Sequence, residues 1–156
     1  MAIKKPLVIT AGQIEQLQAG DSLASNDLVS RTNSNASPII IGQAVYVDGA
    51  GTVDLAQANA VGTKNVLGLV ADVSIASAAS GGILTDGVLT ATTGQWDAVT
   101  GQVGGLTAGA KYFLSASTAG GLTTTAPTVS GDYVAGIGQG LSTTEMEITI
   151  SQTVRL

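Results

Sequence analysis

Beyond Pro38, short apolar runs alternate with turns rich in Gly, Asp and Ser, a pattern typical of β-strands. PIIIGQAVYV predicts a strand, and DGAGTVDL carries a turn signal at Asp48-Gly49 and a returning strand. NVLGLVADVSIA reads as a buried run. No stretch past residue 25 has a convincing 3.6-residue period, so the pattern favours an all-β protein.

The C-terminal half predicts two hairpins and a final pair of strands. Asp86-Gly87 separates Ile83–Thr85 from Val88–Thr90, which indicates a two-residue type I′ turn with positive φ at both positions. AKYFLS and GGLTTT predict the second hairpin. DYVAGIGQGL and EMEITIS supply the last strands, and the latter alternates apolar and polar residues.

Two segments of the chain resemble each other. Gly42–Asp48 and Gly109–Ser115 each run from Gly through an apolar-aromatic pattern into a Gly-rich turn. A returning strand follows at Val53 or Leu122, and then VLGL at residues 66–69 or VAGI at residues 134–137. We interpret this as an internal duplication of about residues 42–90 and 109–150, joined by the 86–87 hairpin and a loop carrying Trp96. The alternative is that a Gly-rich β chain aligns with itself by chance.

Residues 1–37 differ from the β-rich domain that we assign to residues 38–156. KPLVITAG predicts one strand over residues 7–10, and GQIEQLQAGD predicts one helical turn or a bent extended piece. ASNDLVSRTNSNASP has little periodicity and is interpreted as a loop. The apolar residues of this arm argue that it docks on a surface.

The composition favours a chain that packs against other chains. Charged residues make up 11% of the sequence, against about 25% in a typical domain. Aromatic residues make up only 3%, while Gly contributes 21 residues, so backbones can approach closely. We therefore expect an oligomer, the alternative being a monomer with an Ala- and Val-rich core.

The charges argue against nucleic-acid and membrane partners. The net charge is −5, and the six Lys and Arg residues are scattered, so the basic stripe needed for direct nucleic-acid binding is missing. The apolar run at the N-terminus has only four positions, too few for a signal peptide or a membrane span. We expect neither partner.

The residue inventory favours no enzyme. The chain contains no His and no Cys, which removes the Ser-His-Asp and Cys-His arrangements and the usual zinc sites. Glu145 and Glu147 lie two apart on one predicted strand, most simply facing solvent. Asp48 and Asp54 flank a turn and could share Ca²⁺, but turn formation explains them as well, because the spacing of an EF-hand loop is lacking. We expect no cofactor and no metal.

Trp96 is the single tryptophan, within TGQWDAVTG. Two interpretations stay open. It plugs the end of a β-barrel or anchors an intersubunit contact, or it offers a platform on which a sugar stacks.

GLTAGAKYFLSASTAGGLTT, followed by SGDYVAGIGQGLSTTEMEITI, resembles a β module of structural proteins of tailed bacteriophages. KPLVITAGQIEQLQAGDSL is similar to N-terminal segments of such proteins. The motifs fit head decoration (cement) proteins, which usually sit as trimers on the outside of the capsid, and also tail-fibre proteins. The short chain is similar to the decoration class.

The resemblance implies a structural virion protein that stabilises a capsid from the outside by bridging subunits of the major capsid protein. The expected fold is a compact β-barrel or sandwich with an extended N-terminal arm, in a homotrimer made in the host cytoplasm. The alternative is a tail-fibre or tail-tip component that binds a receptor or glycan. Capsid or intersubunit contacts are expected at Leu7, Val8, Ile9, Ile14, Leu17 and Trp96.

Overall fold

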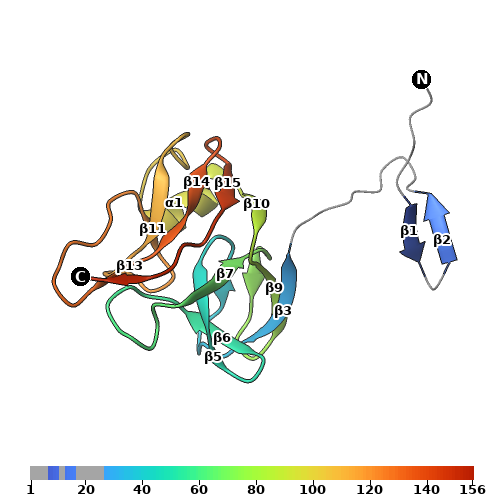
Figure 1. Ribbon diagram of the computed structural model, residues 1–156, viewed down its shortest axis with the longest axis horizontal. Helices are drawn as coiled ribbons and strands as arrows, with labels where there is room; N and C mark the ends of the chain where they lie inside the picture. The colour runs from blue at the N-terminus through green and yellow to red at the C-terminus, as the bar shows by residue number, and fades with distance from the viewer. Residues whose placement is uncertain (1–6, 11–12, 17–26) are drawn as a thin grey trace.

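The computed structural model describes residues 7–10, 13–16 and 27–156 (Figure 1). The fold is mostly β, as the sequence predicts, with a single short helix in this part of the chain. Most strands fall into two five-stranded units, one closed and one open. The expected choice between barrel and sandwich therefore resolves into a closed barrel packed against an open sheet.

The first unit is a closed barrel in the order β3-β6-β5-β7-β9. Its strands pair antiparallel except β3 and β6, which run parallel. The barrel strands are β3 (Leu28–Asn33), β5 (Ala44–Gly49), β6 (Thr52–Leu55), β7 (Val66–Val70) and β9 (Ser80–Leu84). A short pair, β4 (Ile39–Ile40) with β8 (Ser74–Ile75), adds Ile39 and Ile75 to the cluster of β-branched residues that these strands bury.

The second unit is an open antiparallel sheet in the order β10-β15-β14-β11-β12. Its strands are β10 (Gly87–Thr90), β11 (Lys111–Leu114), β12 (Leu122–Thr123), β14 (Gly136–Gly140) and β15 (Glu145–Ile148). Two further pairs lie outside both units: β13 (Tyr133–Val134) with β16 (Val154–Arg155), and β1 (Leu7–Thr10) with β2 (Gln13–Gln16).

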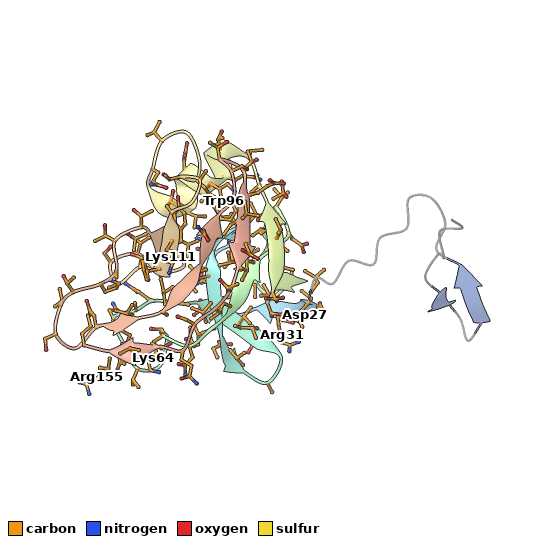
Figure 2. The ribbon with its side chains drawn as sticks, turned by 45° about the horizontal axis from the view of Figure 1, so that its top comes forward. Asp27, Arg31, Lys64, Trp96, Lys111 and Arg155 are labelled. Atoms are coloured by element: carbon orange, nitrogen blue, oxygen red, sulfur yellow. The ribbon has the colours of Figure 1, made fainter. Side chains whose placement is uncertain are left out.

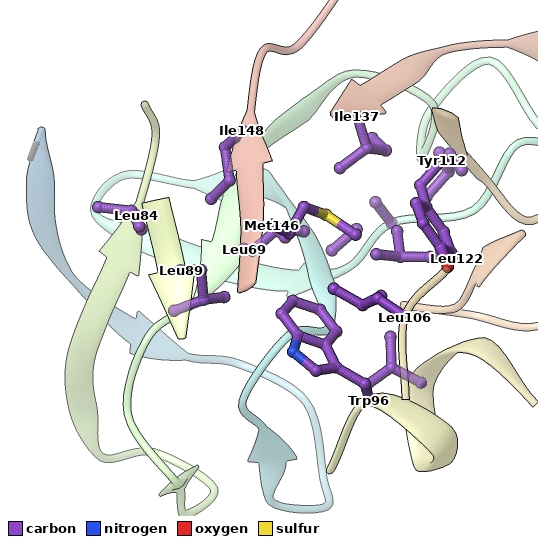
Figure 3. Close-up of a cluster of buried hydrophobic side chains, with 14 of the residues drawn as sticks. Leu69, Leu84, Leu89, Trp96, Leu106, Tyr112, Leu122, Ile137, Met146 and Ile148 are labelled. Atoms are coloured by element: carbon purple, nitrogen blue, oxygen red, sulfur yellow. The ribbon is translucent and has the colours of Figure 1, made fainter. Parts of the chain in front are cut away.

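The larger core lies between the two units (Figure 3). The open sheet contributes the side chains of Tyr112, Ile137 and Met146, and the barrel contributes Leu69 and Leu84. Each fully buried side chain of this size stabilises the fold by roughly 1.5–3 kcal/mol relative to its exposure to water. The two units therefore share one core.

Helix α1 (Thr93–Thr100) was not expected from the sequence. It buries only Trp96 and Val99, too few apolar positions to give a detectable 3.6-residue period. Local signals were nevertheless present. Thr92 and Gln95 form a capping box, and Gly101 ends the helix in the left-handed conformation with φ +68°.

The predicted hairpin at Asp86-Gly87 is wrong. Strand β9 pairs with β3 and β7, whereas β10 pairs with β15, so the chain crosses from barrel to open sheet at this point. Gly87 has a φ of +104°, but Asp86 is not among the positive-φ residues, so the type I′ conformation is not formed. Tertiary pairing has overridden a strong local turn signal.

Other predicted elements are confirmed. The hairpins over 44–55 and 111–123 form, and β15 buries Met146 and Ile148 while exposing Glu147. Residues 28–33, assigned to the N-terminal loop by the sequence, form β3 of the barrel. The folded body therefore starts at about residue 27.

Candidate functional site

The described surface carries hollows beside the open sheet and α1. One is an open groove of about 380 Å³ beside the 111–123 hairpin, lined mostly by Ser, Thr and Ala, with Asp132 as its single carboxylate. A second of about 240 Å³ lies over β11 and β14 beside Lys111, Phe113 and Gln139. A third of about 250 Å³ lies under the end of α1. None of the three lining sets brings two acids together.

Asp48 and Asp54 are held by the segment that follows β3. Ser34 Oγ donates to Asp48 Oδ2 at 2.6 Å, and Asn35 Nδ2 donates to Asp54 Oδ1 at 2.7 Å. The bond from Ser34 lowers the pKa of Asp48, with a further contribution from Thr52. Burial raises the pKa of Tyr46, and the charges of Asp54 and Asp48 raise it further. These carboxylates fix a loop to a hairpin, which is the structural role expected of turn aspartates.

Glu145 and Glu147 lie on strand β15, as the sequence predicts for two acids on one strand. Glu145 accepts a bond from Ser142 Oγ at 3.5 Å, and Glu147 is exposed on the same strand. Among residues 27–156 and the two arm strands, no three acidic side chains gather where a metal ion could be held.

Trp96, predicted as a contact or plug residue, lies in the core. Its side chain is 0% exposed, and its Nε1 donates to the Thr144 carbonyl at 3.0 Å. The ring packs over Gly42, where an added Cβ would lie 2.9 Å from the indole. Figures 2 and 3 show it inside the body, between α1 and the strands. The Trp96 ring is therefore inaccessible to a sugar or to a partner protein. The glycan-binding interpretation can no longer rest on this residue.

Four of the predicted arm contacts fall on the β1–β2 hairpin. Leu7, Val8 and Ile9 lie in β1 and Ile14 lies in β2, with Ile9 paired to Ile14. Leu17 lies outside the described residues. The expected strand over residues 7–10 is confirmed, and the following segment takes the extended form rather than a helical turn. Within the described chain, β1 and β2 pair only with each other.

The sequence missed an open sheet edge at β10. This strand pairs with β15 alone, so its other edge carries no neighbouring strand within the described chain. Val88 on β10 is 41% exposed, and Leu28 at the start of β3 is 57% exposed. The predicted 86–87 hairpin had paired β10 with β9 and so concealed this edge.

A second exposed apolar zone surrounds the β13–β16 pair. Val129, Val154 and Leu156 are all exposed, and backbone bonds tie the 129–132 turn to the last strand. Lys64 lies over the ring of Tyr133 at 5.2 Å from its centroid. Lys64 and Arg155 lie at the same end of the body (Figure 2). Grouped exposed apolar residues of this kind often mark a protein interaction surface.

Comparison with models of known protein families and with curated protein sequences finds no match for this chain. In the described part of the chain, no helix has the length and apolar character needed to span a membrane. The geometry of the arm and of the open edges therefore carries the functional argument.

Proposed function

We propose that this chain is a structural virion protein that decorates the outside of a phage capsid and stabilises it by bridging subunits of the major capsid protein. It acts as a homotrimer. The carrying observation is the β1–β2 hairpin, which forms a two-stranded sheet of its own and pairs with neither of the two five-stranded units within the described residues.

A hairpin of this size needs a partner. Its strands are four residues each, and an isolated two-stranded hairpin is marginally stable at best in water. Strand addition to an exposed sheet edge supplies the missing backbone bonds, and alternate side chains of an added strand give specificity. A hairpin that needs such an edge suits a protein that assembles with other chains.

Capsid stabilisation then follows from mass action. A protein that binds the assembled lattice but not free coat subunits shifts the equilibrium toward the intact shell. In a trimer, the second and third subunits engage the lattice intramolecularly, so weak single contacts sum to tight binding. No catalytic group is required for this activity.

The first test is the copy number of this chain on purified particles of the phage that encodes it, measured by quantitative mass spectrometry against the major capsid protein. We expect hundreds of copies per particle, removable without loss of the tail. A few copies located at the tail would replace the proposal with a tail-component role, and complete absence from particles would refute it.

The second test removes the arm. The variant lacking residues 1–26 keeps the barrel and the open sheet, because the hydrogen bonds of those units lie within residues 27–156. We expect it to fold with an unchanged circular dichroism spectrum and to lose binding to capsids stripped of the protein. Val103→Asp, at a side chain 98% exposed, serves as the surface control against Ile9→Asp. Wild-type occupancy by the truncated chain would contradict the role given to the arm.

A further inference from the structure

We propose that the open edge of β10 receives the β1–β2 hairpin of a second copy, so that the chains exchange arms. The inference rests on the proposed function, because it assigns the contact that builds the decorating homotrimer. It names both surfaces of the contact: the outer edge of the open sheet and the hairpin of the neighbour.

The backbone of β10 has free hydrogen-bonding capacity on one side. Ala91 N donates to Thr144 O at 2.9 Å, so alternate residues 87, 89 and 91 direct their backbone groups toward β15. The N–H and C=O groups of Val88 and Thr90 therefore point to the outer edge. No backbone bond from the described residues reaches them there. Unpaired edges of this kind are templates for strand addition.

The corresponding edge in the barrel is filled. Strand β3 occupies the same place in its unit as β10 does in the open sheet, next to β9 or β15 respectively. The other side of β3 pairs with β6 through Thr32 and Asn33. In the barrel, the edge of β3 that faces away from β9 is paired with β6. In the open sheet, the corresponding edge of β10 has no partner strand within the described chain.

The surroundings of the edge are apolar, and the arm leaves the body beside them. Val88 and Leu28 expose their side chains, and Leu28 pairs with Leu84 three residues before β10 begins. The Asp27 carbonyl accepts bonds from both the N–H and the Oγ1 of Thr85, at 2.9 and 2.7 Å. The first described residue after the arm, Asp27, is therefore fixed close to the start of β10 (Figure 1).

The hairpin matches this edge in strand length, and both lack a neighbouring strand on the outer side. Strands β1 and β2 have four residues each, as does β10, and none of the three has a pairing partner on its outer side within the described chain. Adding the hairpin would extend the five-stranded sheet to seven strands. That extension supplies the neighbour that a two-stranded ribbon lacks.

A second copy is the donor because, within the single described chain, β1 and β2 pair only with each other and the outer edge of β10 stays open. A contact between the arm of one copy and the edge of the next is heterologous, and it closes into a ring when the rotation permits, as in a trimer.

The test measures the solution mass of the purified full chain and of Val88→Pro by light scattering. Proline at residue 88 removes only an outward N–H and keeps the ladder with β15, because edge strands tolerate proline at such positions. We expect the wild type at a multiple of 15.4 kDa and the folded variant at 15.4 kDa. Val88→Lys should likewise be monomeric. Its control is Val47→Lys, at an exposed valine on a strand that is paired on both sides, and this control should keep the wild-type mass.

Two further measurements decide the matter if Val88→Pro fails to fold. The chain has no Cys, so Val88→Cys and Ile9→Cys on differently tagged chains report any disulfide without background. We expect a disulfide between the two tags. We also expect the Val88 amide to exchange slowly in the full chain and at least tenfold faster after deletion of residues 1–26.

Three outcomes would overturn the inference: a monomeric wild type, a folded Val88→Pro with wild-type mass, or a disulfide that forms only within one chain carrying both cysteines. These outcomes are distinct from failure of the proposed function. A monomer present in hundreds of copies on capsids would refute only the exchange of arms between copies. An arm-exchanged oligomer that is absent from capsids would refute only the proposed decorating function.

Discussion

The barrel and the open sheet of this protein use the same strand order, yet one closes and the other does not. In chain order, β3, β5, β6, β7 and β9 correspond to β10, β11, β12, β14 and β15. In the barrel, β5 lies between β6 and β7, and in the open sheet β11 lies between β12 and β14. They differ at the last step, because β3 also pairs with β6 whereas β10 and β12 remain apart.

The correspondence extends to local irregularities. The ladder of β5 with β7 shifts between Val45 and Tyr46, and the ladder of β11 with β14 shifts between Tyr112 and Phe113. Gly42 and Gly109, which precede these strands by equal spacing, have φ of +85° and +80°. The units that correspond in the structure run from β3 to β9 and from β10 to β15, so β10 belongs to the second unit, whereas the sequence interpretation placed residues up to about 90 in the first copy.

Side-chain size explains why only one unit closes. The barrel buries Val45 and Val53, whereas the corresponding positions of the open sheet carry the larger residues Tyr112 and Leu122. A five-stranded barrel encloses little volume, so β-branched residues fill it and large side chains do not fit. In the open unit, β10 ends and α1 begins at Thr93, which brings Trp96 into the space that closure would remove.

The largest effect is therefore expected at Trp96. Trp96→Ala should lower the free energy of unfolding by about 3–5 kcal/mol, because it empties the space between the two units and removes the bond to Thr144. Chemical denaturation measures the change. Val103→Ala, at a fully solvated side chain, should change stability by less than about 0.5 kcal/mol. Equal effects of the two variants would show that the open unit does not depend on its tryptophan.

The matched strands β7 and β14 offer a second test. A Cβ added at Gly68 would collide with the Leu84 carbonyl, and one added at Gly138 would collide with the Glu147 carbonyl. Gly68→Ala and Gly138→Ala should each destabilise the protein by about 1–3 kcal/mol. Gly62→Ala, with open space around it, is the control and should be nearly neutral. A large effect in one unit and none in the other would break the correspondence.

A smaller effect is expected at the helix that keeps the second unit open. Thr92→Ala removes the N-cap of α1 and should cost about 1 kcal/mol in unfolding experiments. Thr128→Ala, an exposed threonine outside any helix, provides the comparison. If Thr92→Ala behaved as the Thr128 variant does, the capping box would not be the feature that starts the helix.

The units also differ in how well the sequence predicted them. The hairpins over 44–55 and 111–123 were found because their turns are local and their strands adjacent. The sequence repeat aligned Val53 with Leu122, in agreement with the strand pairing. It aligned Gly68 with Gly136, but in the structure Gly68 pairs with Val45 and Gly138 pairs with Tyr112, so Gly138 is the equivalent of Gly68. Single-residue shifts within ladders are set by tertiary packing, which no local pattern records.

The candidate site was predicted less completely than the fold. The arm strand was readable from Leu7, Val8 and Ile9, because apolar residues in a polar segment need a surface. Trp96 was placed at a surface or barrel end because a lone tryptophan between glycines resembles a loop residue, and the capping box was overlooked. The β10 edge was hidden because Asp86-Gly87 is the strongest short hairpin signal, and only the pairing with β15 overrules it.

The smallest expected effect concerns a feature confined to the barrel. Asp48 and Asp54 accept bonds from Ser34 and Asn35, while Ser115 and Thr123 occupy the corresponding positions of the open unit. The pKa of Asp48 is lowered in the folded state by the Ser34 bond, so its contribution to stability is present above the unfolded pKa of about 3.9. That contribution is lost as the pH falls through the lower, folded value.

Ser34→Ala should accordingly destabilise the protein by only a few tenths of a kcal/mol, about the worth of an exposed interaction, at pH 7. The difference from wild type should shrink as the pH falls through the folded pKa of Asp48, as measured by thermal unfolding across pH, and the remainder belongs to the bond from Ser34 Oγ to the Val53 carbonyl at 2.9 Å. Ser117→Ala, whose hydroxyl bonds only to Ser115 Oγ in the open unit, should show a pH-independent effect. A pH-dependent difference for Ser117→Ala, or none for Ser34→Ala, would show that the barrel does not hold its Asp48 loop by the charge of that carboxylate.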